Sequence, residues 1–415
     1  MSRRNAAVAR TASSAALAAD QSTESGGGPS VRLLIGLAVL GILLRFAIAA
    51  CSWGTSDTLS FSRFAWSIDH QGILATYRTD PEFNHPPIPA YWAWLALQPT
   101  REHPYVFAFL FRVPIILFDA ASLWLLWRIW RARSTPRRAA TVAALYAWCP
   151  AAILVSGYHG NTDAVYAFLC LLCVYLIEQK KQPLWGGLAL AAAINVKLVP
   201  VLLILPLAMS FRRRGDLMRF AIGVALGVLP FVPILLMAGR NFAANALAYK
   251  SRVDLWGVNY FLLQAVGGAA DSGPLPAAVL FYRDFGRYLL LALVAAWSIA
   301  ARLLPRWNRY EVAAVTLAIF LILAPGFGVQ YTVIVLPLMF AARVRFAVIY
   351  GLCAGAFLFA AYLVFWDGGF PFSSLFNQMF PPVVGTMGLP AWGVLIAFVL
   401  VTVAGGLRRR DLAAP

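Results

Sequence analysis

Apolar runs of about 20 residues recur along nearly the whole chain, and they constrain the fold more than any other feature of the sequence. As a helix, each run is long enough to cross the roughly 30 Å hydrocarbon core of a bilayer. Hydrophobic residues make up 61% of the 415 residues and charged residues only 12%, a composition unlike that of water-soluble globular domains. We therefore expect an all-α, multi-pass membrane protein, a transmembrane helix bundle of about 12 spans.

The basic residues show how the bundle is oriented. The formal net charge of +17 could suit a nucleic-acid partner. The Lys and Arg residues, however, gather in short segments between apolar runs, for example Arg212 to Arg214 and Arg408 to Arg410. This pattern is typical of cytoplasmic loops. We expect no nucleic-acid partner, a location in the plasma (inner) membrane, and both termini in the cytoplasm.

The same pattern divides the chain into segments. Residues 1–30 are rich in Ala, Ser, Gly and Arg and are expected to form a disordered cytoplasmic tail. Residues 31–407 form the transmembrane domain, and residues 408–415 a second cytoplasmic tail. One long apolar stretch has basic residues at both ends, so we expect a break between Lys197 and Pro200. Two polar stretches, residues 52–104 and 239–287, are then large outer loops.

The first outer loop carries the leading catalytic candidate, Asp57, directly after the first span. A carboxylate at that depth can act as a general base that deprotonates an acceptor hydroxyl. The alternative is a helix N-cap, because Leu59, Phe61 and Phe64 follow Asp57 with a helical period. Both roles can coexist.

Two further polar segments belong to the same outer side. His85 stands before Pro86 and Pro87, which stiffen the loop; it is either a substrate-orienting residue or an exposed imidazole in a rigid turn. The segment from His159 to Asp163 closes one span and opens the next. Asn161 and Asp163 could cap the following helix, and His159 and Asp163 could form a hydrogen-bonded pair at the site.

Charges within apolar segments are the third group of candidates. Arg112 and Asp119 lie two turns apart on one helix, and Arg45 and Lys197 lie in other spans. Such residues mark either a functional pathway or a structural pair, and Lys197, beside a helix break, suits a phosphate. Basic residues of the second outer loop could neutralise a phosphate or contact anionic headgroups; they are Arg240, Lys250, Arg252, Arg283 and Arg287.

In combination, these segments resemble the GT-C superfamily of integral-membrane glycosyltransferases, in particular its bacterial polyprenyl-phosphate-mannose-dependent type. The resemblance runs from about residue 45 to about residue 337. The residues that carry it are Asp57, Phe83 to Ile88, Arg112 to Pro114 with Asp119, His159 to Asp163, Gly186 to Lys197 with Pro200, and Pro325 to Tyr331 leading to Pro337.

The resemblance implies a glycosyltransferase that moves one sugar, mannose or another hexose, from a polyprenyl phosphate to a lipid or envelope-glycan acceptor, with inversion. It implies Asp57 as the catalytic base, His159 and Asp163 as lining residues, and Gln330 and Tyr331 on the donor side. Some relatives carry two adjacent acidic residues where this chain has only Asp57, so a metal-dependent version is not expected. No cofactor is expected, and the lipid-linked sugar is a substrate.

Two other classes of function remain open from the sequence. A secondary transporter or lipid flippase would use Arg112, Asp119 and Lys197 as pathway charges. It would be expected to show two related halves, and no internal repeat is visible. A catalytically inactive assembly scaffold would tolerate the loss of the Asp57 carboxylate.

Overall fold

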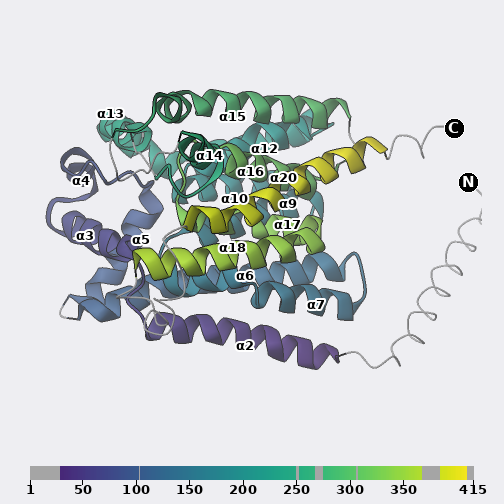
Figure 1. Cartoon of the computed structure of the whole chain (residues 1–415), viewed down its shortest axis with the longest axis horizontal. Coiled ribbons are helices and arrows are strands. Elements are labelled where there is room, and N and C mark those ends of the chain that lie inside the picture. Colours follow the sequence, from purple (N-terminus) through teal and green to yellow (C-terminus); the bar gives the residue numbers. More distant parts are fainter. Residues whose placement is uncertain are drawn as a thin grey trace, which may run out of the picture.

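The computed structural model shows a bundle of α-helices (Figure 1). It describes residues 29–101, 103–248, 252–266, 274–304, 307–366 and 384–408. Over these ranges no β-strand forms, and a single antiparallel bridge joins Arg252 to Phe327. The prediction of an all-α fold is confirmed. The two expected tails lie almost wholly outside the described residues.

Many helices begin at a proline, as expected for a residue that fixes its backbone torsion and has no amide proton to leave unpaired. The longer helices are α2 (Val31–Ala50), α3 (Ser56–Gln71), α5 (Pro87–Leu97), α6 (Pro104–Arg131), α7 (Pro136–Ala147), α9 (Asp163–Glu178), α10 (Pro183–Val196), α12 (Arg214–Gly227), α13 (Val232–Ala248), α14 (Gly257–Ala265), α15 (Ala277–Leu303), α16 (Arg309–Leu323), α18 (Val344–Phe365) and α20 (Val384–Arg408). The shorter ones are α4 (Ile73–Thr79), η2 (Gln98–Thr100), α8 (Pro150–Ile153), η3 (Leu154–His159), η4 (Val199–Leu203), α11 (Ile204–Met209), η5 (Leu229–Phe231), η6 (Val329–Val333) and α17 (Leu336–Ala342).

Six helical segments of the described chain are long and apolar enough to cross a membrane; they are Val31–Ala50, Val106–Arg131, Arg214–Ala246, Ala277–Leu303, Val344–Phe365 and Val384–Arg408. A seventh crossing would be the pair Pro136–Ala147 and Pro150–His159, bent by 54°. The expected count of about 12 spans is not confirmed. The remaining apolar helices are short: α10 has 14 residues, which gives it a length of about 21 Å.

The long apolar stretch that was expected to break does so. Helix α10 ends at Val196, Lys197 is extended with φ −157° and ψ 149°, and η4 and α11 continue the chain. The second expected outer loop, in contrast, is largely helical in its described part. It contains the end of α13, all of α14 and the start of α15.

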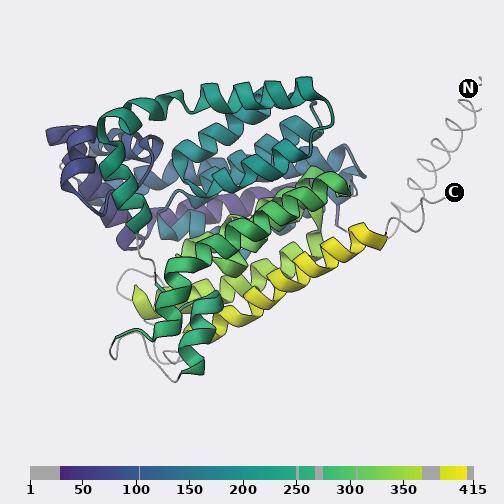
Figure 2. The same ribbon diagram turned by 90° about the horizontal axis from the view of Figure 1, so that it is seen from above.

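The connections meet at two ends of the bundle. At one end, Asp57 contacts His159 and Asp163 contacts Lys197. At the other end, Arg309 contacts both Glu178 and Ser210. Helix α2 begins and α20 ends at this second end (Figure 1). Seen from above, the helices up to α13 lie in one half and those from α15 to α20 in the other (Figure 2).

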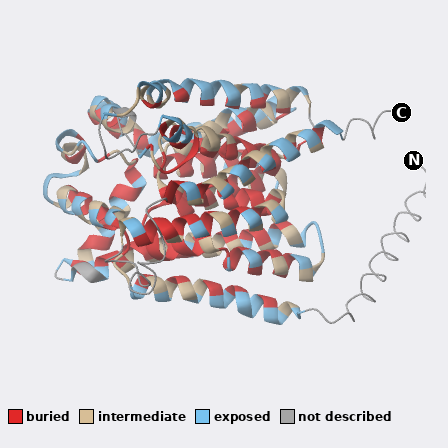
Figure 3. Cartoon of the chain, viewed as in Figure 1, coloured by how far each residue is buried: buried red, intermediate tan, exposed pale blue. Residues whose placement is uncertain are grey.

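Residues 52–104, the segment expected to be the first outer loop, fold into a cap of helices at the first end of the bundle, where α3 packs against α5 and α4 (Figure 1). The predicted helical period is correct for the buried face of α3, which carries Phe61, Phe64, Ala65 and Ile68. Leu59, however, is exposed. Buried residues fill the interior of the bundle while its outer helices expose their outward faces (Figure 3).

A buried ion pair ties α2 to α6. The Nε atom of Arg45 lies 2.7 Å from Oδ2 of Asp119, and both side chains are fully buried. The hydroxyls of Ser156 and Tyr146 also donate to the Asp119 carboxylate. Asp119 therefore pairs with Arg45 and not with Arg112, its neighbour on the same helix.

Arg112 instead donates hydrogen bonds to backbone carbonyl oxygens. Its guanidinium donates to the carbonyl oxygens of Ala49, Ser52, Gly157 and Tyr158. These carbonyls belong to the end of α2 and to η3, where helix ends leave acceptors unpaired. Arg112 is thus a structural residue that joins the end of α2 to η3.

Candidate active site

Thr55 and the first turn of α3 place Asp57 at the site. The Thr55 side chain caps α3 by accepting from the Asp57 amide, and its hydroxyl donates to the carbonyl oxygen of His159 at 2.7 Å. The alternative in which Asp57 caps the helix is therefore wrong. Because Thr55 supplies the cap, the Asp57 carboxylate is available for other contacts.

A turn with unusual backbone geometry presents the residues that meet Asp57. The chain forms a π-helical turn, η3, up to His159, and Gly160 then adopts a left-handed conformation with φ +79°. A Cβ atom on Gly160 would lie 2.1 Å from Oγ1 of Thr58. Only glycine satisfies both requirements, the positive φ and the close approach of α3. Turns of this kind often occur at functional sites.

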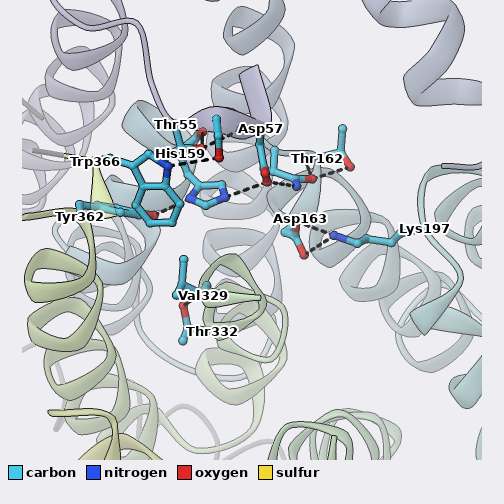
Figure 4. A network of polar contacts seen from close by, with 12 residues as sticks. Thr55, Asp57, His159, Thr162, Asp163, Lys197, Val329, Thr332, Tyr362 and Trp366 are labelled. Atoms are coloured by element: carbon cyan, nitrogen blue, oxygen red, sulfur yellow. Dashed lines mark hydrogen bonds and ion pairs between the residues drawn. The ribbon is translucent and has the colours of Figure 1, made fainter. Parts of the chain in front are cut away.

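Asp57 accepts two hydrogen bonds from this turn on the same oxygen atom (Figure 4). Its Oδ2 lies 3.0 Å from Nε2 of His159 and 2.5 Å from Nδ2 of Asn161. For Oδ1, the described part of the chain offers no hydrogen-bond partner. About a third of the Asp57 side chain, 31%, is exposed. The carboxylate is thus held through one oxygen and open at the other.

The far side of the imidazole is bound by a tyrosine from the C-terminal half. Nδ1 of His159 lies 3.0 Å from the hydroxyl of Tyr362 on α18. The ring of Trp366 meets the imidazole edge to face at 5.9 Å, and its indole nitrogen donates to Ser56. Residues from α3, η3 and α18 therefore meet around one histidine (Figure 4).

A second ionic pair lies beside the first. Asp163, the first residue of α9, is fully buried, and its two oxygens lie 3.2 and 3.0 Å from Nζ of Lys197. The Tyr166 hydroxyl donates to the same carboxylate at 2.8 Å. The Lys197 ammonium also lies over the ring of Tyr331, 4.7 Å from its centroid. The predicted pair of His159 with Asp163 does not form, because each residue has another partner.

One member of each pair, Asp57 and Lys197, lines a cavity of about 440 Å³. The other two members, His159 and Asp163, are not among the described residues that line it. The cap helices, the η3 turn, the break after α10 and the segment before α17 all contribute to its wall. Polar and aromatic groups dominate the lining; the members with chemistry are Asp57, Ser60, Phe61, Glu82, Asn84, His85, Asn161, Lys197, Gln330 and Tyr331. A cavity with several convergent polar groups is the usual form of a small-molecule site.

The surroundings of the cavity keep the Asp57 carboxylate ionised and the His85 imidazole neutral. Burial raises the Asp57 pKa, but the hydrogen bonds and charges of its neighbours, His159 foremost, lower it, and the net pKa lies well below the usual carboxyl range. Burial and the charge of Lys197 lower the His85 pKa to about 3. The His85 ring is not an exposed imidazole, since it packs on Phe61 with ring centroids 4.7 Å apart.

The predicted residues of the second outer loop lie elsewhere. Arg252 is exposed, pairs with Asp254 at 2.6 Å and lies over the ring of Phe365. It is not among the described residues that line the cavity. Arg283 contacts its neighbour Asp284, and Lys250 lies outside the described residues. The cation at the cavity is Lys197.

Several residues at the site were not predicted from sequence: Ser60 and Asn84 line the cavity, and Tyr362 and Tyr166 bind His159 and Asp163 beside it. Tyr362 and Tyr166 lie within apolar helices, where a tyrosine is ordinarily a core residue, so the sequence carries no signal for them. Ser60 and Asn84 stand in the polar first loop, but polarity alone does not separate them from their neighbours. Only the folded chain brings them to the site.

Comparison with known protein families gives one match. The sequence model of glycosyltransferase family 87 matches residues 83–325, more than half of the chain. The matched region includes His159, Asp163 and Lys197, whereas Asp57 and Tyr331 lie outside it. No curated protein sequence matches the chain. The all-helical bundle, the apolar helices and the family match together show that this chain belongs to glycosyltransferase family 87, a family of membrane-embedded, GT-C-like glycosyltransferases.

Proposed function

We propose that the protein transfers one sugar, mannose or another hexose, from a polyprenyl-phosphate donor to a lipid or envelope-glycan acceptor at the outer face of the plasma membrane. The observation that carries the proposal is the shared cavity: a carboxylate with one open oxygen, Asp57, and an ammonium group, Lys197, line the same 440 Å³ space. Membership in a glycosyltransferase family supports the class of reaction.

In the proposed reaction, the acceptor hydroxyl oxygen attacks the anomeric carbon while the bond from that carbon to the phosphate oxygen breaks. The bonding electrons leave with the phosphate, giving free polyprenyl phosphate. The hydroxyl proton moves to Oδ1 of Asp57, the oxygen with no hydrogen-bond partner in the described chain. A single displacement inverts the anomeric configuration.

His159 and Asn161 position the base in this proposal. Both bind Oδ2, so the carboxylate cannot rotate without losing two hydrogen bonds. Since a general base must lie within hydrogen-bond reach of the proton it takes, a fixed carboxylate aligns the acceptor with the anomeric carbon. Because the Asp57 pKa is lowered, the base is ionised at neutral pH.

Lys197 and Tyr331 fit the donor phosphate. The ammonium group has three hydrogens, and its contact with Asp163 leaves donor capacity for a phosphate oxygen. With Gln330, which also lines the cavity, these residues would receive the charge that develops on the leaving group. Asp163 holds Lys197 at this position and is itself fully buried.

We propose that transfer needs no resident metal ion. Each of the two carboxylates at the centre already has a donor from the protein: Asp57 binds His159 and Asn161, and Asp163 binds Lys197 and Tyr166. Across the described residues, no group of three or more His, Cys, Asp or Glu side chains converges. Full transfer activity after dialysis against a chelator would support the proposal, and activity restored only by a divalent cation would contradict it.

The outer-face assignment rests on charge. The basic turns, such as residues 212–214, gather at the end of the bundle opposite the cavity. By the positive-inside rule this end is cytoplasmic. The protein would then be a multi-pass plasma-membrane protein with both termini in the cytoplasm and its cavity facing the periplasm or the cell exterior.

The proposal is tested by incubating purified protein with a panel of polyprenyl-phosphate sugars and with envelope lipid extracts as acceptors. Mass spectrometry would identify a product heavier by one sugar. We expect product from one donor class with the wild type and none with Asp57→Asn. Transfer from a nucleotide sugar instead, or equal product with the variant, would contradict the proposal.

A further inference from the structure

A second polar cavity, of about 550 Å³, lies at the end of the bundle opposite the candidate active site. The last turn of α9 and the connections α9–α10 and α11–α12 form its wall, together with the start of α16. The side chains that line it are Ile177, Lys181, Pro183, Phe211, Arg212, Arg213, Asp216, Arg219 and Arg309. The proposed transfer reaction uses none of them.

The charge of this cavity is strongly unbalanced. Five cationic side chains line it, and two of them have carboxylate partners: Arg309 lies 2.7 Å from Glu178, and Arg219 lies 3.7 Å from Asp216. For the other three, the described residues supply no acidic partner; they are Lys181, Arg212 and Arg213. Although these three side chains are exposed, an excess of positive charge in one concave site attracts anions.

A neighbouring basic cavity holds its cations in a different way. That cavity, of about 590 Å³, is lined by Arg128, Arg131, Arg133 and Lys180 among others. Three of these cations lie over aromatic rings, Arg128 over Trp124, Arg133 over Tyr310 and Lys180 over Tyr175. Its cations are therefore partly satisfied within the protein.

The surroundings of the first cavity identify the anion as amphiphilic. Phe211, Ile177 and Pro183 give the cavity apolar walls beside its cations. An exposed apolar stripe runs along α12, the helix that carries the cavity residues Asp216 and Arg219, through Met218, Ile222 and Leu226, four residues apart and thus on one helix face. A free phosphate would use the cations alone, whereas a phospholipid would use both the cations and the stripe.

We propose that this cavity is a binding site for the headgroup of an anionic phospholipid, whose acyl chains lie along the exposed face of α12. The site is separate from the one that takes the lipid-linked sugar. The lipid would join the α9–α10 turn to the α11–α12 turn, and so stabilise α9, which begins at Asp163, and α10, which ends directly before Lys197.

The test compares two triple variants of the full-length protein that remove the same charge from the same end of the bundle. The first is Lys181→Gln, Arg212→Gln and Arg213→Gln in the cavity. The control is Arg32→Gln, Arg137→Gln and Arg138→Gln, outside it. Native mass spectrometry of the delipidated protein would measure binding of phosphatidylglycerol, of phosphatidylcholine with the same chains, and of glycerol phosphate as a headgroup without chains.

We expect wild type and control to bind phosphatidylglycerol alike and to prefer it over phosphatidylcholine. The cavity variant should bind it about 100-fold more weakly, since each basic residue near an anionic headgroup contributes about fivefold in affinity. A charge-conserving variant, Arg212→Lys with Arg213→Lys, should retain binding, which separates loss of the site from loss of folding. Equal weakening in both triple variants, equal binding of the two lipids, or glycerol phosphate binding as tightly as the whole lipid would overturn the proposal.

Discussion

Two buried ionic groups in this molecule use similar residues in opposite ways. In the membrane-spanning part, Arg45 and Asp119 are both fully buried, and Ser156 and Tyr146 complete the shell of the carboxylate. At the end of the bundle, the Asp57 carboxylate is 31% exposed and keeps one oxygen without a partner in the described chain. The first group is closed by protein, and the second opens into a cavity.

The comparison shows how a structural charge differs from a candidate catalytic one. A fully buried pair has no accessible surface to offer a substrate, even though Nη2 of Arg45 has no hydrogen-bond partner among the described residues. Arg112 is of the same closed kind, since its guanidinium is taken up by backbone carbonyls. Two of the three charges that a transporter pathway would use, Arg112 and Asp119, are therefore occupied in holding helices together. Substitutions in the two groups should therefore have different effects, on stability for the buried pair and on transfer for Asp57.

The largest effect is expected at Asp57. Asp57→Asn keeps the shape and removes the base, so the transfer rate should fall about 10²- to 10⁴-fold, the usual contribution of general-base catalysis. Binding of the donor should be retained. Asp69→Asn, on the same helix but bonded to Trp94 and Gln98, is the matched control and should transfer normally. An inactive scaffold would show no difference between the two variants.

Substitutions in the buried Arg45–Asp119 pair should change the stability of the protein and not its transfer rate. Asp119→Asn leaves Arg45 buried without its carboxylate partner, which should lower the free energy of unfolding by about 3–5 kcal/mol. Thermal or denaturant unfolding in detergent would measure the loss, and the transfer rate per folded molecule should stay near the wild-type value. Asp216→Asn, which removes an exposed contact to Arg219 at 3.7 Å, should cost under about 1 kcal/mol. A folded Asp119→Asn protein with normal stability and no transfer would contradict the structural role of Asp119.

Lys197 should show an intermediate effect. Lys197→Met removes the cation proposed for the phosphate and should lower kcat/KM about 10²- to 10³-fold, in line with the loss of a single electrostatic donor. The change also leaves Asp163 buried without its cation, so the double variant Lys197→Met with Asp163→Asn controls for folding. A stable double variant with wild-type kcat/KM would remove Lys197 from donor binding.

Tyr362 should have a smaller effect, as a positioning residue. Its hydroxyl meets Nδ1 of His159, and Nε2 of that ring faces Asp57. Tyr362→Phe should lower kcat by about 3- to 10-fold with little change in KM, consistent with the loss of one hydrogen bond of about 1 kcal/mol. Tyr350→Phe removes a buried hydroxyl from the same helix, one bound to the carbonyl of Thr332, and should leave kcat unchanged. Equal losses in both variants would mean that the Tyr362 effect is structural.

The smallest effect concerns pH. A general base is active when deprotonated, so activity is lost only as pH falls through its pKa in the folded protein. The Asp57 pKa lies below its usual value and the His85 pKa is about 3. Neither group should therefore produce an acid limb between about pH 5 and 8. A limb in the pH profile of kcat/KM that disappears in His85→Gln would contradict this.

The fold class could be predicted from the sequence, because apolar runs of about 20 residues are typical of membrane-spanning helices. The sequence also located the helix break at Lys197, where a charge and Pro200 interrupt an apolar run. It did not predict the number of spans, since short helices such as α10 and bent pairs such as α7 with α8 and η3 are not distinguished by hydropathy. Nor did it predict that α14 and the start of α15 form within residues 239–287, because their polar composition suggested a loop.

For the site, the sequence identified the polar residues but not their pairing. His159 and Asp163 were expected to face each other, yet they contact Asp57 and Lys197. Partners 102 and 34 positions apart depend on how α3, η3 and the break after α10 meet, which local pattern does not encode. Arg252 was selected by charge alone, and its neighbour Asp254 takes up that charge.

The central claim is that the donor phosphate and the base share the cavity between the cap helices and α9. Its most direct test is a cryo-electron microscopy structure of Asp57→Asn with the polyprenyl-phosphate sugar bound. We predict phosphate density beside Lys197 and Tyr331, with the anomeric carbon facing the side chain at position 57. Phosphate density at the basic cavity on the opposite end, with the cavity at Asp57 empty, would contradict the account.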